Sequence, residues 1–164
     1  MPRYELWLDD SNSADIQARI KTLPRQEKSA WDILDLEAGI LLIQDSESTL
    51  YTPEELNLDL AGFISFNKGC YTGQEIVARM HFRGKANKRL FLASFETDAA
   101  AENLTLYDNS GKALGTLFNL QCLNDTRHIG LVILKTNTAL TESFRLGEEE
   151  TSSSVMLSPF SHIE

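Results

Sequence analysis

The sequence predicts an α+β fold, with helices in its first half and short strands in its second half. Up to about residue 87, four segments begin with residues typical of helix starts. After that point, short apolar runs alternate with turn residues, at the spacing of a small antiparallel barrel or sandwich. This change of pattern predicts a domain boundary between residues 1–87 and 88–164.

The helices of the first half are predicted from residues that cap helix ends. Ser29 and Asp32 have the spacing of a capping box. The helix that they open would turn Trp31, Leu34 and Ala38 toward the core. The expected helix starts are Ser13, Ser29 and Thr52, the expected ends of the first two helices are Pro24 and Gly39, and short strands are expected at residues 4–8 and 41–43.

The strands of the second half are predicted from short apolar segments with turns between them. Residues 108–111, Asp-Asn-Ser-Gly, give the clearest hairpin signal. Cys122 shares its strand alternation with Phe118 and Leu120, so we expect its thiol in the core. The predicted strands are residues 89–95, 104–107, 113–123, 129–135, 144–146 and 155–157.

The most informative segment for function is residues 68–75, Lys-Gly-Cys-Tyr-Thr-Gly-Gln-Glu. Thr72 and Glu75 have the spacing of a capping box, so Thr72 is the expected N-cap of a helix. Cys70 then lies beside the unpaired N–H groups of the helix start, with Lys68 nearby as a cation. Both features favour the thiolate, which nucleophilic, redox and metal chemistry require. Cys70 and Lys68 are therefore the predicted catalytic pair.

Each residue of this segment also has a purely structural alternative. A free cysteine is often a small buried apolar residue. The two glycines can be turn residues, or they can allow a ligand or partner to approach the backbone. The polar pair at the helix start can serve as caps, and the tyrosine can be a packing anchor. These residues are Gly69, Cys70, Tyr71, Gly73, Gln74 and Glu75.

The octapeptide resembles the signature of the YgfZ family, folate-binding proteins linked to iron–sulfur cluster maintenance and tRNA modification. Segments on both sides are similar to the family as well: residues 36–40 and 53–59 upstream, and 76–79 and 83–84 downstream. The resemblance covers residues 31–90. Family members are about twice as long and carry the signature in their second half. The resemblance therefore implies that this chain corresponds to the C-terminal half, whether as a piece of a longer protein or as a short form.

The resemblance implies a fold and a cofactor site. The fold is a partial ferredoxin-like element that carries the signature loop, followed by a Greek-key β-barrel. Glu37 is implied to contact the pterin ring of tetrahydrofolate, because a carboxylate can accept two N–H bonds from it. Asp35 and Leu41 stand where relatives often have arginine and proline. We therefore expect an incomplete folate site.

The function implied by the resemblance is that of a folate-linked accessory factor for the assembly or repair of iron–sulfur enzymes, including tRNA-modifying ones, through the Cys70 thiol. Its partners would be iron–sulfur proteins or their assembly machinery. The alternative is a folate-dependent aminomethyltransferase like the related T protein of the glycine cleavage system, which has a similar loop but usually no cysteine there. A third alternative is an interaction fragment without a ligand. Formation of methylene-folate from an aminomethyl donor would distinguish the enzyme.

The charge pattern favours a local anion site over general nucleic-acid binding. A net charge of −9 opposes broad binding to phosphates, so direct binding of nucleic acid is not expected. Between Ile76 and Phe95, however, there is no acidic residue. Arg79, Arg83 and Lys85 in this stretch are predicted to bind an anion or an acidic partner, and a solvated edge is the equally weighted alternative.

Composition predicts a cytoplasmic protein without a metal site of its own. No apolar run approaches the roughly 20 residues of a membrane span, and no signal peptide is visible. Two cysteines, Cys70 and Cys122, do not make a disulfide framework, which favours a reducing compartment. They are also too few for the four-thiolate shell of an iron–sulfur cluster, so a cluster would be transient or shared between chains.

Overall fold

The computed structural model describes residues 4–9, 13–41, 43–84, 86–97, 104–138, 140, 143–147 and 153–160. Within these residues every helix precedes residue 84 and every strand follows residue 87, as the sequence predicted except for the strands expected at residues 4–8 and 41–43. The helices are α1 (Ser13–Ile20), α2 (Lys28–Glu37), the short 3-10 helix η1 (Asp45–Glu47) and α3 (Gln74–Arg83). The strands are β1 (Lys88–Glu96), β2 (Thr105–Tyr107), β3 (Ala113–Thr116), β4 (Phe118–Cys122), β5 (Arg127–Lys135), β6 (Phe144–Leu146) and β7 (Ser154–Ser158).

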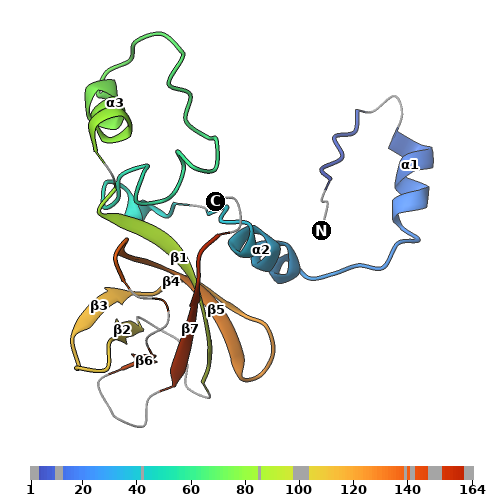
Figure 1. Cartoon of the computed structure of the whole chain (residues 1–164). Helices are drawn as coiled ribbons and strands as arrows, with labels where there is room; N and C mark the ends of the chain where they lie inside the picture. The colour runs from blue at the N-terminus through green and yellow to red at the C-terminus, as the bar shows by residue number, and fades with distance from the viewer. Residues whose placement is uncertain are drawn as a thin grey trace.

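The strands form one antiparallel sheet in the order β3-β2-β6-β7-β1-β5-β4. β1 and β5 pair along their whole length, from Lys88 opposite Lys135 to Glu96 opposite Arg127. The sheet curls until β3, at one edge, contacts β5, next to the other edge, which gives a nearly closed barrel (Figure 1). The antiparallel barrel predicted for the second half is confirmed.

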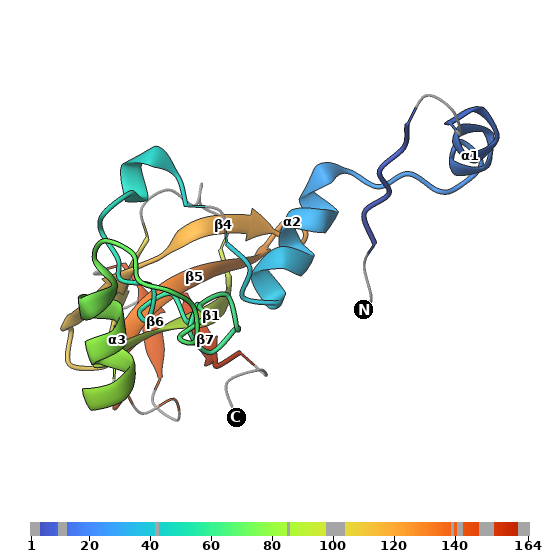
Figure 2. The ribbon, with the colours of Figure 1, turned by 90° about the horizontal axis from the view of Figure 1, so that it is seen from above.

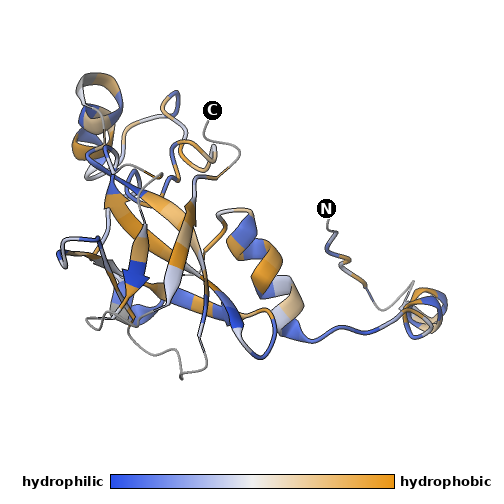
Figure 3. Cartoon of the chain, turned by 60° about the horizontal axis from the view of Figure 1, so that its bottom comes forward, coloured by the Kyte–Doolittle hydropathy of each residue, from blue (hydrophilic) through white to orange (hydrophobic). Residues whose placement is uncertain are grey.

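The two long central strands are buried on both faces. Inside the barrel, Phe91 and Phe95 of β1 pack with Val132 of β5 and side chains of the other strands. On the outer face, Leu90 and Leu131 pack against α2 and the C-terminal segment in a second apolar cluster. Figure 3 shows that apolar stretches run along the strands and that the helix beside the barrel carries apolar residues too. Burial on both faces makes β1 and β5 the most protected part of the described chain.

The strand predicted over residues 113–123 is two strands, because Leu117 turns into the core between them. The pairing of β4 with β5 then shifts register between Phe118 and Gln121, and Asn119 has a φ of 50°. A register shift moves the following side chains to the other face of the sheet. Cys122 is therefore exposed, and the prediction of a core thiol is wrong.

The expected ferredoxin-like element is not confirmed. None of the described residues before Lys88 belongs to a strand, so the strand predicted at residues 4–8 is wrong. Of the strand predicted at 41–43, Leu41 and Ile43 lie outside any strand, and Leu42 lies outside the described residues. Residues 4–8 and α1 lie away from the barrel in both views, so they have no sheet edge to pair with (Figures 1 and 2). The division into two domains at residue 87 stays a prediction.

The second helix forms where predicted but with a different cap and a different buried face. Its N-cap is Glu27, and no side chain caps the helix. The Asp32 carboxylate forms an ion pair with the Lys28 ammonium, with Lys28 Nζ and Asp32 Oδ1 2.6 Å apart, and does not form the predicted capping box with Ser29. Leu36 is its buried residue, whereas Trp31 is 38% exposed. The contact of α2 with the outer face of β5 decides which face of the helix is buried, since the spacing of apolar residues along α2 allows more than one face to be buried. Its predicted end is confirmed, because Gly39 takes a left-handed φ of 69°.

The helix predicted at Thr52 forms as a series of turns over residues 53–62. Thr52 and Glu55 do exchange capping hydrogen bonds, of 3.0 and 3.3 Å. We call residues 52–62 the turn segment. It is not propagated as a helix because its side chains bind β1: Asn57, with a φ of 58°, donates to Leu90 O (2.9 Å) and accepts from Leu90 N (3.4 Å). This attachment fixes where the signature loop begins.

Candidate functional site

The signature loop, residues 63–73, connects the turn segment to α3 (Figure 1). The N-cap of α3 is Gly73, with a left-handed φ of 87°, and no side chain caps the helix. The prediction that Thr72 is the N-cap is therefore wrong, because the glycine at the next position turns the backbone first. Gln74 reaches back instead, and its Oε1 accepts a hydrogen bond from Tyr71 N at 3.2 Å.

Cys70 is exposed in this loop, three residues before the N-cap of α3. The Lys68 ammonium lies over the Tyr71 ring, 5.2 Å from its centroid, so the contact of Lys68 is a cation–π contact. Tyr71 is thereby held both through its ring and through its main chain. The structure thus brings Lys68, Tyr71 and Gln74 together around one small cavity.

The two glycines that flank Cys70 serve different purposes. A Cβ added at either position would meet no atom within 4 Å, so neither glycine avoids a clash. Gly73 is required by its positive φ, which other residues adopt with strain. Gly69 has no such φ, and it leaves the backbone beside Cys70 open to solvent. A ligand or partner could therefore approach the backbone at Gly69, as the functional interpretation of this glycine requires.

An aromatic cluster holds α3 against the loop. Phe66 stacks on the His81 ring with centroids 3.6 Å apart, and Phe82 meets the His81 ring edge to face at 4.8 Å. A small cavity of about 40 Å³ lies between this cluster and Lys68, Tyr71 and Gln74. Residues 66 and 81 are far apart in the sequence and follow no common periodicity, so sequence reasoning missed this cluster.

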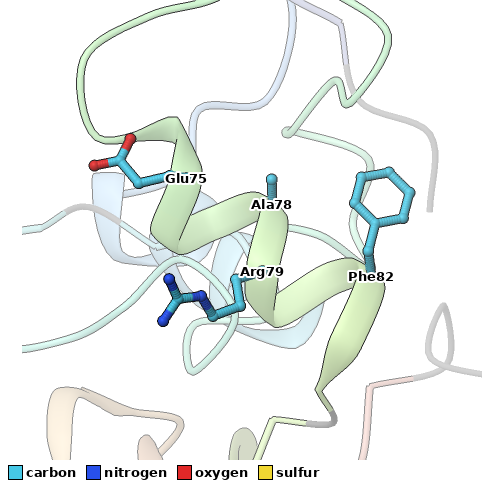
Figure 4. Close-up of a pocket in the computed structure, with 4 residues that line it drawn as sticks. All are labelled: Glu75, Ala78, Arg79 and Phe82. Carbon is cyan, nitrogen blue, oxygen red and sulfur yellow. The ribbon is translucent and has the colours of Figure 1, made fainter.

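The predicted basic residues have different surroundings. Arg79 is exposed on α3, one turn after Glu75, and both residues line an open cavity of about 360 Å³ with Ala78 and Phe82 (Figure 4). The side chain of Arg83 and the whole of Lys85 lie outside the described residues. Anion binding by these three residues stays a prediction.

Glu37 is exposed at the end of α2, next to the buried Leu36. α2 and α3 lie apart in Figures 1 and 2, and neither Glu37 nor Cys70 lines the cavities found beside these helices. A cavity of about 490 Å³ beside α2 is lined by Glu5, Trp31, Asp35 and Ile40, and not by Glu37. A folate needs most of its surface enclosed. The incomplete folate site expected at Glu37 therefore stays a prediction.

Neither a metal centre nor a membrane helix is found in the described part of the chain. Its His, Cys, Asp and Glu side chains form no group of three or more that could hold a metal ion. Both Cys70 and Cys122 are free. The longest helices among the described residues, α2 and α3, have 10 residues each, and no described helix has the length and apolar character of a membrane span.

No family model matches this chain, but curated relatives share sequence with most of it. The tRNA-modifying protein YgfZ of Edwardsiella ictaluri is 39% identical over 130 residues, which cover 76% of this chain and 39% of the relative. The tRNA-modifying protein YgfZ of Enterobacter sp. (strain 638) is 35% identical over 136 residues, which cover 80% of this chain and 41% of the relative. The chain thus spans about two fifths of the length of these relatives.

Proposed function

The chain belongs to the YgfZ family, and we propose that it acts in tRNA modification as an accessory factor for the assembly or repair of iron–sulfur enzymes, through the thiol of Cys70. The names of both relatives support the link to tRNA modification. The iron–sulfur clients and the role of the thiol are the finer part of the proposal. They rest on the signature residues and on the geometry of the loop.

The observation that carries the proposal is the exposure of Cys70 on open backbone. The small cavity beside the loop, of about 40 Å³, is lined by Lys68, Tyr71 and Gln74 and not by Cys70, so the thiol lies on the open surface of the loop and outside that cavity. An exposed thiol on an open loop suits reaction with a macromolecular partner. It suits the aminomethyltransferase alternative less well, because that enzyme must enclose a folate.

A cluster handled by this chain would be its substrate and would be held jointly with the partner. Thiolate is the usual ligand of iron–sulfur clusters, and four ligands are the rule. Cys70 supplies one, and Cys122 lies at the end of β4, on the barrel and not on the loop. The partner must therefore supply most of the ligands, which is why we propose iron–sulfur proteins or their assembly machinery as partners.

Tetrahydrofolate is proposed as a ligand of the family site to which this chain contributes Glu37. The Glu37 carboxylate is exposed, so it could contact the pterin ring but would not by itself enclose the folate. No step of the proposed thiol function passes through the folate. For the chain alone we propose weak binding or none, which calorimetry with tetrahydrofolate measures; sub-micromolar binding that Glu37→Gln abolishes would contradict this.

The basic residues of α3 and its C-terminal end, Arg79, Arg83 and Lys85, are proposed to bind an anionic group of the partner. Arg79 is exposed close to the loop, which supports this. Arg79→Glu should lower function with an almost unchanged thermal midpoint, because exposed charges typically contribute less than about 1 kcal/mol to stability. Arg19→Glu, on α1, is the matched control. Equal activity of both variants would leave Arg79 without a role.

The experiment that tests the proposed function compares the two exposed cysteines. Bacterial cells that lack their own family member would express the chain, its Cys70→Ser variant or its Cys122→Ser variant. Modified nucleosides in total tRNA are then measured by mass spectrometry. We expect wild type and Cys122→Ser to raise modification equally and Cys70→Ser to leave it at the deletion level. Full modification with Cys70→Ser would show that the thiol is not needed.

A further inference from the structure

The main chain that follows Cys70 is tied to the first residue of α3 by two hydrogen bonds. Gln74 Oε1 accepts from Tyr71 N at 3.2 Å, and Gln74 N donates to Tyr71 O at 3.3 Å. The second bond closes a turn over residues 71–74. Gly73, the third residue of this turn, has a φ of 87° and a ψ of −3°, close to the values that type II turns take there. One helix residue thus binds both main-chain polar groups of Tyr71.

The first of these bonds acts directly on the backbone of Cys70. The Tyr71 N–H belongs to the peptide group that joins Cys70 to Tyr71, and the six atoms of a peptide group lie in one plane. The Cys70 Cα is one of these atoms, so the bond to Gln74 restrains its position. Within the described residues, neither the Gly69 N–H nor the Cys70 N–H donates a hydrogen bond. The restraint on the Cys70 backbone therefore comes from the side that faces α3.

A second contact holds the same stretch of chain from its other end. The Lys68 ammonium lies over the Tyr71 ring, 5.2 Å from its centroid, so Gly69 and Cys70 lie between two residues that contact each other. Glycine alone would allow this stretch many backbone conformations. Gln74 is half-buried, so the residue that fixes Tyr71 is itself held in place. The exposed thiol is thus carried by a backbone that is restrained on both sides.

We propose that Gln74 is a positioning residue for the thiol of Cys70. It acts through Tyr71: its carboxamide oxygen fixes the Cys70–Tyr71 peptide group and keeps the thiol in front of the positive end of α3. The inference rests on the proposed function, in which Cys70 reacts with a macromolecular partner. A thiol that is already oriented loses less conformational freedom when it reaches the reacting geometry. The contact requires an acceptor oxygen at position 74, which a glutamate also supplies.

The test uses three variants of the full 164-residue chain. Gln74→Met keeps the length of the side chain and removes the oxygen, whereas Gln74→Glu keeps an acceptor oxygen. Gln17→Met makes the same change at an exposed position of α1 and is the matched control. NMR measures the order parameter of the Cys70 N–H and the exchange rate of the Tyr71 N–H. Iodoacetamide gives the ratio of the Cys70 and Cys122 alkylation rates, and the thermal midpoint reports on the fold.

We expect Gln74→Met to speed exchange of the Tyr71 N–H roughly threefold to tenfold, because the bond lost is a single surface hydrogen bond. The order parameter of the Cys70 N–H should fall, and the Cys70-to-Cys122 rate ratio should move toward its value in urea. The thermal midpoint should stay nearly unchanged. Gln74→Glu should restore the exchange rate and the order parameter, and Gln17→Met should match wild type in every measurement.

The proposal is overturned if Gln74→Met leaves the Cys70 order parameter and the Tyr71 exchange rate at their wild-type values, or if Gln74→Glu does not restore them. If Gln74→Met does not fold, the wild-type chain decides: after correction for sequence, the Tyr71 N–H should exchange more slowly than those of Gly69 and Cys70, and equal rates overturn the proposal. The tRNA modification assay separates the two proposals. Full modification with Cys70→Ser would refute the proposed function, while greater mobility of Cys70 in Gln74→Met would still support the positioning contact.

Discussion

The barrel and the signature loop differ in how their residues are held. β1 is paired on both sides, with β5 and β7, and side chains on both of its faces are buried. The loop before α3 is held by a few contacts, the Lys68–Tyr71 pair and the Phe66–His81 stack among them, and its cysteine is exposed. The comparison indicates that the barrel supplies stability, whereas the loop is available for chemistry at low cost to the fold.

The largest expected effect separates the two regions directly. Leu131→Ala removes a fully buried side chain from the outer face of β5, and we expect it to lower the free energy of unfolding by about 2–5 kcal/mol. Ile76→Ala, on α3, truncates a side chain that is 62% exposed, and its effect should stay within about 0.5 kcal/mol. Urea unfolding measures both. Similar losses in the two variants would abolish the contrast between the regions.

The next effect tests the contact that attaches the turn segment, and with it the signature loop, to β1 of the barrel. Asn57→Ala deprives Leu90 of both side-chain hydrogen bonds and places alanine at a positive φ, so we expect a loss of about 1–3 kcal/mol. Asn57→Gly is the matched variant, because glycine tolerates this φ but also lacks the amide. Alanine should therefore cost more than glycine in urea unfolding. If neither variant changes stability, the turn segment is not fastened to β1 as described.

A smaller effect distinguishes the two glycines of the loop. Gly73→Ala forces alanine to a φ of 87° and should cost about 1–2 kcal/mol. Gly69→Ala meets no atom and no positive φ, so its unfolding free energy should be unchanged or slightly raised. Urea unfolding again decides. A larger loss for Gly69→Ala would contradict the roles assigned to the two residues.

The smallest effect belongs to the hairpin between β2 and β3. Hydrogen bonds from the Ser110 hydroxyl and then from the Lys112 main chain hold the pKa of Asp108 below its ordinary value. A carboxylate with a lowered pKa stabilises the native state above its unfolded pKa and loses that contribution as pH falls through the folded pKa. NMR titration should give a lower midpoint for Asp108 in the native chain than in urea. Equal midpoints would refute this.

The barrel was predictable because its strands alternate locally, and five of the six predicted strands lie within two residues of observed ones. The break at Leu117 was not predictable, because it depends on packing between strands that lie far apart in the sequence. The exposure of Cys122 follows from that break. Local pattern also failed where tertiary contacts compete with it, as at Thr52, whose capping bonds form without a helix.

The candidate site was predicted in part. The sequence located the loop, but it placed the cap at Thr72 because a threonine–glutamate pair outweighed the glycine between them. The ion pair between Asp59 and Arg89 could not be predicted, since these two residues are brought together only by the fold. Contacts between residues that are distant in sequence leave no periodic signal.

Alkylation of the two cysteines tests the central claim most directly, namely that the fold prepares Cys70 as the working thiol. Both thiols are exposed, but the Cys122 Sγ donates to Asn124 O at 2.7 Å, whereas Cys70 lies before the positive end of α3. Rates with iodoacetamide are read by peptide mass spectrometry in the folded chain and in urea. We predict that Cys70 reacts several times faster than Cys122 in the folded chain and at an equal rate in urea. The same rate ratio in both states would contradict the claim.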